Sequence, residues 1–353
     1  MGGADVGGAE EQERQEWEHP GTFPVAAGVY RIPLPLPGDG LAAVNVYALP
    51  TPDGVTLIDA GWALAGAREH LEAGLARLDL DLGAVREILV THLHRDHFEQ
   101  AVVLQRELGT RVALAEAERP SLTYLLDEEA DHDLSPIVTR LRAAGAGALA
   151  DRIHAHRAQA AAAAEEMPQW GLPDHWLTDG ERLTVGSREL TVLHTPGHTR
   201  GHVVFVDLAG GLLFAGDHVL PHITPSIGFE AVPVDSPLSD YLASLATVRG
   251  LADLRLLPAH GPVQPTTHDR IDALLVHHEH RLRRTAEAVT AGHLTGLEVA
   301  TALPWTRRER RFAELDPFNQ MLAVNETAAH LDVLVRRGEL AVSVVEGVRV
   351  YAA

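Results

Sequence analysis

The sequence predicts an α+β protein in which several apolar strands place polar side chains at one edge of a sheet. Short apolar runs between turn residues indicate strands, and runs with apolar residues at helical spacing indicate helices. Four strand-like runs are followed, just past their ends, by histidine or aspartate; these are residues 88–90, 190–194, 211–216 and 254–258. Because such polar residues converge on one rim of a sheet, we expect these side chains to meet.

The individual elements follow from the turn residues that separate them. Residues 1–20 are polar and acidic, with neither a basic start nor an apolar stretch, and we expect a disordered lead-in rather than a signal peptide. A catalytic domain is expected over residues 21–267. Within it we predict, in order, strands at 28–34, 42–50 and 54–60, a helix at 63–78, a strand from 88 that ends at His92, a helix from 98 and a strand at 111–115.

Two later segments differ in pattern from the rest of the domain. Residues 116–176 are rich in Ala, Leu and charge and are interrupted by four prolines, which predicts a helical insertion. We interpret it as a lid over the substrate pocket, with a packed peripheral subdomain as the alternative. Residues 268–353 predict three helices, the last ending before Gly338, and a hairpin that turns at Glu346-Gly347. This combination suggests a small winged-helix-like domain.

Four short strings hold the residues with the clearest chemical signal. They lie past the strands just described and contain His92, His94, Asp96, His97, His198, Asp217 and His260. Five imidazoles and two carboxylates match the ligands that hold two divalent ions, and zinc accepts both types. In a tight turn at a helix start, the first two histidines can face one ion while Asp96 and His97 face another. A structural metal needs only four ligands, so seven indicate catalysis.

These strings, in this order, resemble the metallo-β-lactamase superfamily of hydrolases over roughly residues 25–265. The resemblance implies an αββα sandwich, in which two sheets are faced by helices, and two metal sites with one bridging carboxylate. The implied ligands are His92, His94 and His198 for one ion, Asp96, His97 and His260 for the other, and Asp217 for both. Asp59 matches a position that usually supports the ligands without binding metal. The tail resembles the C-terminal module of the lactamase-beta-2-like branch.

The chemistry expected at such a centre is hydrolysis. Coordination to zinc lowers the pKa of water from about 15.7 to about 7, so a hydroxide bridging the ions could attack a carbonyl or phosphoryl group that one ion polarises. We expect Asp96 and Asp217 to be the catalytic residues, with Asp96 orienting the hydroxide. Zinc is the expected metal, and iron or manganese would accept the same ligands.

Other polar residues are given supporting roles. We expect Asp59 to fix the tautomer of a ligand histidine and His202 to support the site structurally. His222 and Thr224 lie on a loop just beyond Asp217 and could contact the substrate. The run His277, His278 and His280 is expected on a solvated helix face.

Composition and charge limit the partners. The 353 residues are 46% hydrophobic, and no apolar run approaches the ~20 residues of a membrane span. Cysteine and lysine are absent and the net charge is −20. Residues 1–267 hold 18 Arg against 37 acidic residues, and residues 268–353 hold 11 against 12. Proteins that gather phosphates usually present a basic surface, so nucleic acid is disfavoured. For the tail, packing or homodimer formation is favoured over DNA binding.

Three functions fit these observations. The leading one is a cytoplasmic, dinuclear-metal-dependent hydrolase of a small ester-like acyl compound: a thioester, a lactone or a related derivative. The second is a metal-dependent phosphodiesterase or endoribonuclease, as the resemblance of the tail suggests, and cleavage of single-stranded RNA would distinguish it. The third is a DNA-binding regulator whose metal domain senses a ligand, which a gel-shift test on the tail would reveal.

Overall fold

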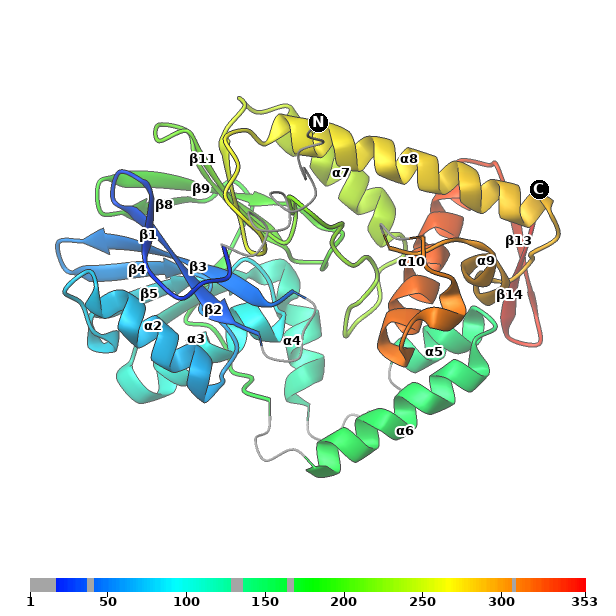
Figure 1. Cartoon of the computed structure of the whole chain (residues 1–353), viewed down its shortest axis with the longest axis horizontal. Helices are drawn as coiled ribbons and strands as arrows, with labels where there is room; N and C mark the ends of the chain where they lie inside the picture. The colour runs from blue at the N-terminus through cyan, green and yellow to red at the C-terminus, as the bar shows by residue number, and fades with distance from the viewer. Residues whose placement is uncertain (1–16, 37–40, 128–135, 164–167, 307–308) are drawn as a thin grey trace, which may run out of the picture.

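The computed structural model describes residues 17–36, 41–127, 136–163, 168–306 and 309–353 (Figure 1). In these residues the strands form two sheets and a separate hairpin. The first sheet has the order β1 (Phe23–Ala26), β2 (Val29–Pro35), β3 (Ala43–Thr51), β4 (Gly54–Ile58), β5 (Val85–Leu89), β6 (Arg111–Ala115), β7 (His175–Leu177). The second has the order β12 (Arg255–Pro258), β11 (Leu212–Gly216), β10 (Val203–Asp207), β9 (Arg188–His194), β8 (Arg182–Val185). The hairpin consists of β13 (Ala341–Val345) and β14 (Val348–Ala352).

Helices connect and cover these strands. In chain order they are α2 (Ala65–Ala76), α3 (Arg95–Leu108), α4 (Arg119–Leu126), α5 (Pro136–Ala143), α6 (Gly147–Ala163), α7 (Pro237–Arg249), α8 (His268–Thr290), α9 (Gly296–Ala302) and α10 (Pro317–Arg336). Short 3-10 turns are η1 (Leu82–Ala84), η2 (Glu116–Glu118) and η4 (Phe312–Glu314). None of the helices in the described ranges is both long enough and apolar enough to cross a membrane.

The two sheets face each other across an apolar core, and helices cover their outer faces. Tyr47 and Leu89 of the first sheet pack with Phe205 and Phe214 of the second, and the rings of Tyr47 and Phe214 meet edge to face with centroids 5.5 Å apart. A second cluster joins the first sheet to α2 and α3, and a third joins the second sheet to α7 and α8. Strands β10 and β11 are buried throughout, because both faces are covered. The expected αββα sandwich is therefore confirmed.

Strand direction explains why polar residues gather at one edge. β4, β5 and β6 run parallel, as do β11 and β12. Their carboxyl ends are followed by Asp59, by the segment from Thr91, by Glu118, by Asp217 and by His260. Parallel strands need crossover connections, and helices α2 and α3 supply them on the first sheet.

The insertion and the tail pack together. Ile137 and Leu141 of α5 and Ile153 of α6 lie in one apolar cluster with Met321 and Val324 of α10. Figure 1 shows α5 and α6 beside α10, α9 and the terminal hairpin, with α8 running from the second sheet to this region. The helices predicted for residues 116–176 and 268–353 and the hairpin are present, while the roles of lid and winged helix stay predictions.

Two expectations differ from the structure at single residues, Trp17 and His278, whereas His277 and His280 are exposed as expected. The lead-in predicted to be disordered lies outside the described residues as far as residue 16, but Trp17 is buried and its carbonyl oxygen accepts a hydrogen bond from Arg31 Nη1 at 2.6 Å. His278 is fully buried rather than solvated, because α10 covers that face of α8 and brings His330 Nε2 to 3.2 Å from His278 Nδ1. The strand predicted to end at His92 ends at Leu89.

Candidate metal centre

The segment between β5 and α3 supplies the first four side chains of the site. His92 is fully buried, and His94 is the extended residue that precedes α3. Asp96 lies in the first turn of α3, where a carboxylate is favoured by the helix dipole, and His97 follows in the same turn. The change from strand to helix therefore places these side chains on one side of the backbone.

Loops after three strands of the second sheet supply the remaining residues. His198 follows β9, Asp217 directly follows β11, and His260 follows β12. Two glycines allow the close approach of these loops. Gly197 (φ +133°) lies against the backbone of Tyr241, where a Cβ would come within 2.5 Å of the backbone N and Cα, and a Cβ at Gly216 would lie 2.8 Å from the Thr91 side chain.

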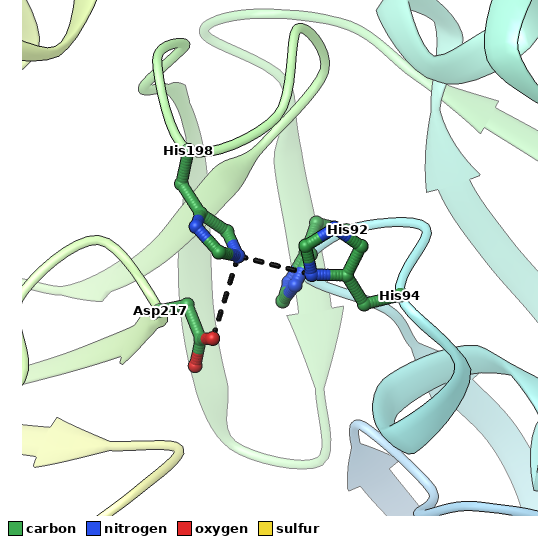
Figure 2. Close-up of side chains that lie close together, drawn as sticks. All are labelled: His92, His94, His198 and Asp217. Carbon is green, nitrogen blue, oxygen red and sulfur yellow. Dashed lines mark hydrogen bonds and ion pairs between the residues drawn. The ribbon is translucent and has the colours of Figure 1, made fainter. Parts of the chain in front are cut away.

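The seven predicted ligands come together in two groups. In each group every residue offers one ligand atom, and these atoms lie within 4.8 Å of one another; the groups are His92, His94, His198 and Asp217, and Asp96, His97 and His260. Figure 2 shows the first group, with His198 Nε2 3.1 Å from His94 Nδ1 and 3.4 Å from Asp217 Oδ2.

Asp217 lies between the two groups. Its second oxygen, Oδ1, is 3.3 Å from His260 Nε2 and 3.7 Å from His97 Nε2. Asp96 Oδ2 closes the second group at 3.3 Å from His260 Nε2 and 3.5 Å from His97 Nε2. One carboxylate thus presents one oxygen to each group, which is the geometry of a bridging ligand.

In each of the five histidines of the two groups, the ring nitrogen that points away from the centre contacts a neighbouring oxygen. His97 Nδ1 lies 2.8 Å from Asp59 Oδ2, and His92 Nδ1 lies 3.0 Å from Thr91 Oγ1. The other three rings use backbone carbonyl oxygens, with contacts from His260 Nδ1 to Ala43 at 2.7 Å, from His198 Nδ1 to Ser226 at 2.8 Å and from His94 Nε2 to Phe229 at 3.3 Å. Each ring nitrogen facing the centre is therefore oriented as a metal ligand requires.

Several atoms that face the centre lack a hydrogen-bond partner within the described chain. They are the buried atoms His92 Nε2, His97 Nε2, His260 Nε2 and Asp217 Oδ1. Buried polar atoms are almost always paired, so this cluster fits bound cations. The donor set of neutral imidazole and carboxylate suits zinc, iron or manganese.

Electrostatics keep the histidines of the first group neutral and favour a positive charge in the second group. Burial, together with the neighbouring imidazole of His198, lowers the pKa of His94 to about 3, and burial also lowers the pKa of His92, so both are neutral near pH 7. For Asp96 burial opposes ionisation, but His97 and His260 outweigh it and lower the pKa of the carboxyl. Burial likewise opposes charge on His97, yet Asp96 and Asp59 raise its pKa well above the ordinary value. The second group therefore has a strong electrostatic preference for a cation.

The other residues named from the sequence differ in how close they lie to the two ligand groups. His202 is fully buried; its Nε2 accepts from the backbone N–H of Asp217 at 3.1 Å, and its Nδ1 lies 2.9 Å from Thr195 Oγ1, which is a supporting role. His222 is half-buried against Gly261, next to His260, and Thr224 is half-buried in the same loop. Their contact with a substrate stays a prediction.

Sequence reasoning missed two buried glutamates beside the site. Glu118 Oε1 accepts from the backbone N–H of Leu93 at 3.3 Å and from Thr199 Oγ1 at 2.5 Å, so it joins the loops of two ligand strings. Glu230 Oε2 accepts from the N–H of Arg200 at 3.0 Å. Burial raises the pKa of Glu118 to about 7 and, with the charge of Glu118, that of Glu230 to about 8. No motif marks either residue.

Comparison with known proteins agrees with this geometry. Residues 39–260 match the Metallo-beta-lactamase superfamily. The chain is 26% identical over 311 residues to the "Probable metallo-hydrolase YqjP" of Bacillus subtilis, which is 86% of this chain and 90% of that protein. It is 28% identical over 237 residues to the "Acyl-coenzyme A thioesterase MBLAC2" of Bos taurus, which is 61% of this chain and 72% of that protein. With two other curated relatives the match spans only 44% and 39% of their length.

Solved structures show the same fold over nearly the whole chain. A metallo-beta-lactamase family protein from Thermus thermophilus superimposes with a TM-score of 0.75 and 29% sequence identity, covering 92% of this chain and 98% of that one. Because 92% of this chain is matched, the likeness includes most of the insertion and most of the tail. The family match covers well over half of the sequence, and the described site brings together the ligand types of a metal-dependent hydrolase. The chain therefore belongs to the metallo-beta-lactamase superfamily, and it is a metallo-hydrolase of that superfamily.

Proposed function

We propose that this enzyme hydrolyses a small acyl compound, with an acyl thioester as the first choice of substrate and a lactone or related ester as the next. The observation that supports it most is the pair of groups on either side of Asp217, because two adjacent cation sites sharing one carboxylate are suited to hydrolysis. The thioester is chosen because a relative that matches 61% of this chain is named an acyl-coenzyme A thioesterase. Action in the cytoplasm is part of the same proposal.

The residues can be given roles in this reaction. One ion would be held by His92, His94 and His198, the other by Asp96, His97 and His260, and both by Asp217. Bound divalent ions supply a hydroxide at neutral pH and polarise the carbonyl under attack.

The chain itself orients the reacting groups. The Asp96 side chain is 18% exposed, more than the 8% of Asp217, so it lies nearer to the side from which the substrate enters and can orient the attacking water as well as hold an ion. Asp59 holds His97 and Thr91 together, which fixes the geometry around that carboxylate. Burial of His92 and His97 excludes bulk water from the inner side of the site.

The test is a substrate panel combined with metal analysis. Purified enzyme loaded with zinc, iron or manganese should cleave acyl thioesters or lactones, the activity should disappear with a chelator, and about two ions should be found per chain. Asp217→Asn serves as the inactive comparison. It removes the negative charge between the two groups, and we expect it to fold but not to hydrolyse the substrate. Cleavage of single-stranded RNA or phosphodiesters with no turnover of any thioester or lactone would overturn the proposal.

A further inference from the structure

The entrance to the metal centre can be located from the exposure of its side chains. His92 and His97 are completely buried, whereas His94 and Asp96 are only half-buried. The substrate must therefore approach past His94 and Asp96. What lies beside His94 decides which group of the substrate is bound next to the bond that is cleaved.

Two phenylalanines from distant segments stand at this point. The ring of Phe229 lies with its centroid 5.8 Å from that of His94, and its carbonyl oxygen is 3.3 Å from His94 Nε2. The ring of Phe318 lies 5.8 Å from that of Phe229, edge to face at 83°. His94, Phe229 and Phe318 thus form a continuous row of rings from the metal centre to the first turn of α10, and we call the two phenylalanines the aromatic wall.

The aromatic wall is supported by packing and by a capped helix although it is open to solvent. Phe229 packs against the apolar cluster shared by α5, α6 and α10. Phe318 follows Pro317 in the first turn of α10, and the Asp316 side chain caps that helix by accepting from the Asn319 N–H at 3.0 Å. Even so, 51% of Phe318 is exposed. A large apolar side chain held open beside a reactive centre is available to a ligand.

We propose that the aromatic wall is an acyl-binding subsite, which takes an unbranched aliphatic chain attached to the carbonyl that is hydrolysed. The inference rests on the proposed function and makes it more specific. The rings offer apolar area and no charge, so a hydrocarbon chain that leaves the carbonyl near His94 would cover Phe229 first and Phe318 after a few methylenes. The C-terminal helix α10 would then set the preferred chain length, whereas the metal ligands would not.

The experiment separates binding from turnover. Straight-chain carboxylates from acetate to decanoate, which resemble the acyl product, are titrated into the zinc-loaded full-length enzyme by calorimetry. Full burial of a methylene improves affinity about fourfold, and we expect an improvement of roughly two- to fourfold per methylene until the chain passes Phe318. Phe318→Ala should abolish the improvement for the distal methylenes and leave acetate unchanged, while Phe318→Leu should retain most of it. Leu208→Ala, at a leucine that is 60% exposed in the β10–β11 turn, is the matched control and should behave as wild type.

The outcomes distinguish the two proposals. A wild-type affinity that does not depend on chain length, or a Phe318→Ala profile equal to wild type, overturns the subsite even if thioesters are cleaved. A chain-length dependence that Phe318→Ala removes supports the subsite, and it does so even if no thioester or lactone is hydrolysed, in which case only the proposed reaction fails. The same variants can then be compared by kcat/KM on acyl thioesters of increasing length, where the loss should grow with chain length.

Discussion

Replacing Asp59 with asparagine tests how the second ion group is supported. Asp59 Oδ1 accepts from the Thr91 N–H at 2.8 Å, and Oδ2 lies 2.8 Å from His97 Nδ1. In Asp59→Asn the remaining oxygen is needed by Thr91, so the amide NH₂ faces His97. Two N–H groups cannot point at each other, and His97 must move its proton to Nε2, the atom that faces Asp96 and His260. A protonated Nε2 cannot bind a metal ion.

The size of the effect follows from this contact. Loss of a carboxylate that supports a ligand histidine lowers the affinity of the site for its metal ion by roughly 10- to 100-fold. This corresponds to about 1.4 to 2.7 kcal/mol. The substitution should add no backbone strain, because Asp59 has φ +59°, a conformation that asparagine also tolerates. Chelator competition with zinc should show one ion bound nearly as in wild type and one bound 10- to 100-fold more weakly. Asp53→Asn, in an exposed turn, is the control. Two ions bound with wild-type affinity in Asp59→Asn would refute the reasoning.

Three further outcomes are expected. Removing metal with a chelator should abolish hydrolysis and lower Tm, and zinc should restore both; a metal-free protein with unchanged Tm would contradict this. For Glu230, burial and then Glu118 raise the pKa from 4.5 to about 8, so its contribution to stability is present below pH 4.5 and is lost as the pH rises through 8. Glu230→Gln should therefore flatten the fall of Tm between pH 5 and 9 in metal-free protein, and an unchanged slope would count against it. For His330, burial lowers the pKa from 6.5 to about 3, so stability is present above pH 6.5 and is lost as the pH falls toward 3. His330→Gln should lose less Tm than wild type between pH 7 and 4.5, and equal acid sensitivity in a calorimetric scan would exclude this origin.

The grouping of the candidate ligands could be predicted because their chemistry is local. His198, Asp217 and His260 each follow an apolar strand, and few residue types bind divalent ions, so position and type together identify them. Asp59, which follows β4, was named from the resemblance to a family. The layers of the sandwich came from the resemblance of these strings to a family rather than from periodicity alone.

Residues whose role depends on distant packing could not be predicted. Phe229 is 135 positions from His94, and nothing in its neighbourhood marks it as part of the site. Glu118 lies in a segment interpreted as a lid, and its contact with Leu93 exists only once β5 and β6 pair. His278 has charged and polar neighbours on α8, so its local pattern indicated solvent, but α10 covers it. In each case a tertiary contact outweighed the local sequence pattern.

Each of the two groups takes residues from both sheets. The first combines His92 and His94 from the end of β5 with His198 and Asp217 from the opposite sheet, and the second is completed across the same gap by His260. Cations bound there fasten the two halves of the protein to each other as well as serving the chemistry. In a medium poor in zinc the enzyme should then lose its resistance to proteases, and its abundance in the cell should follow the supply of metal.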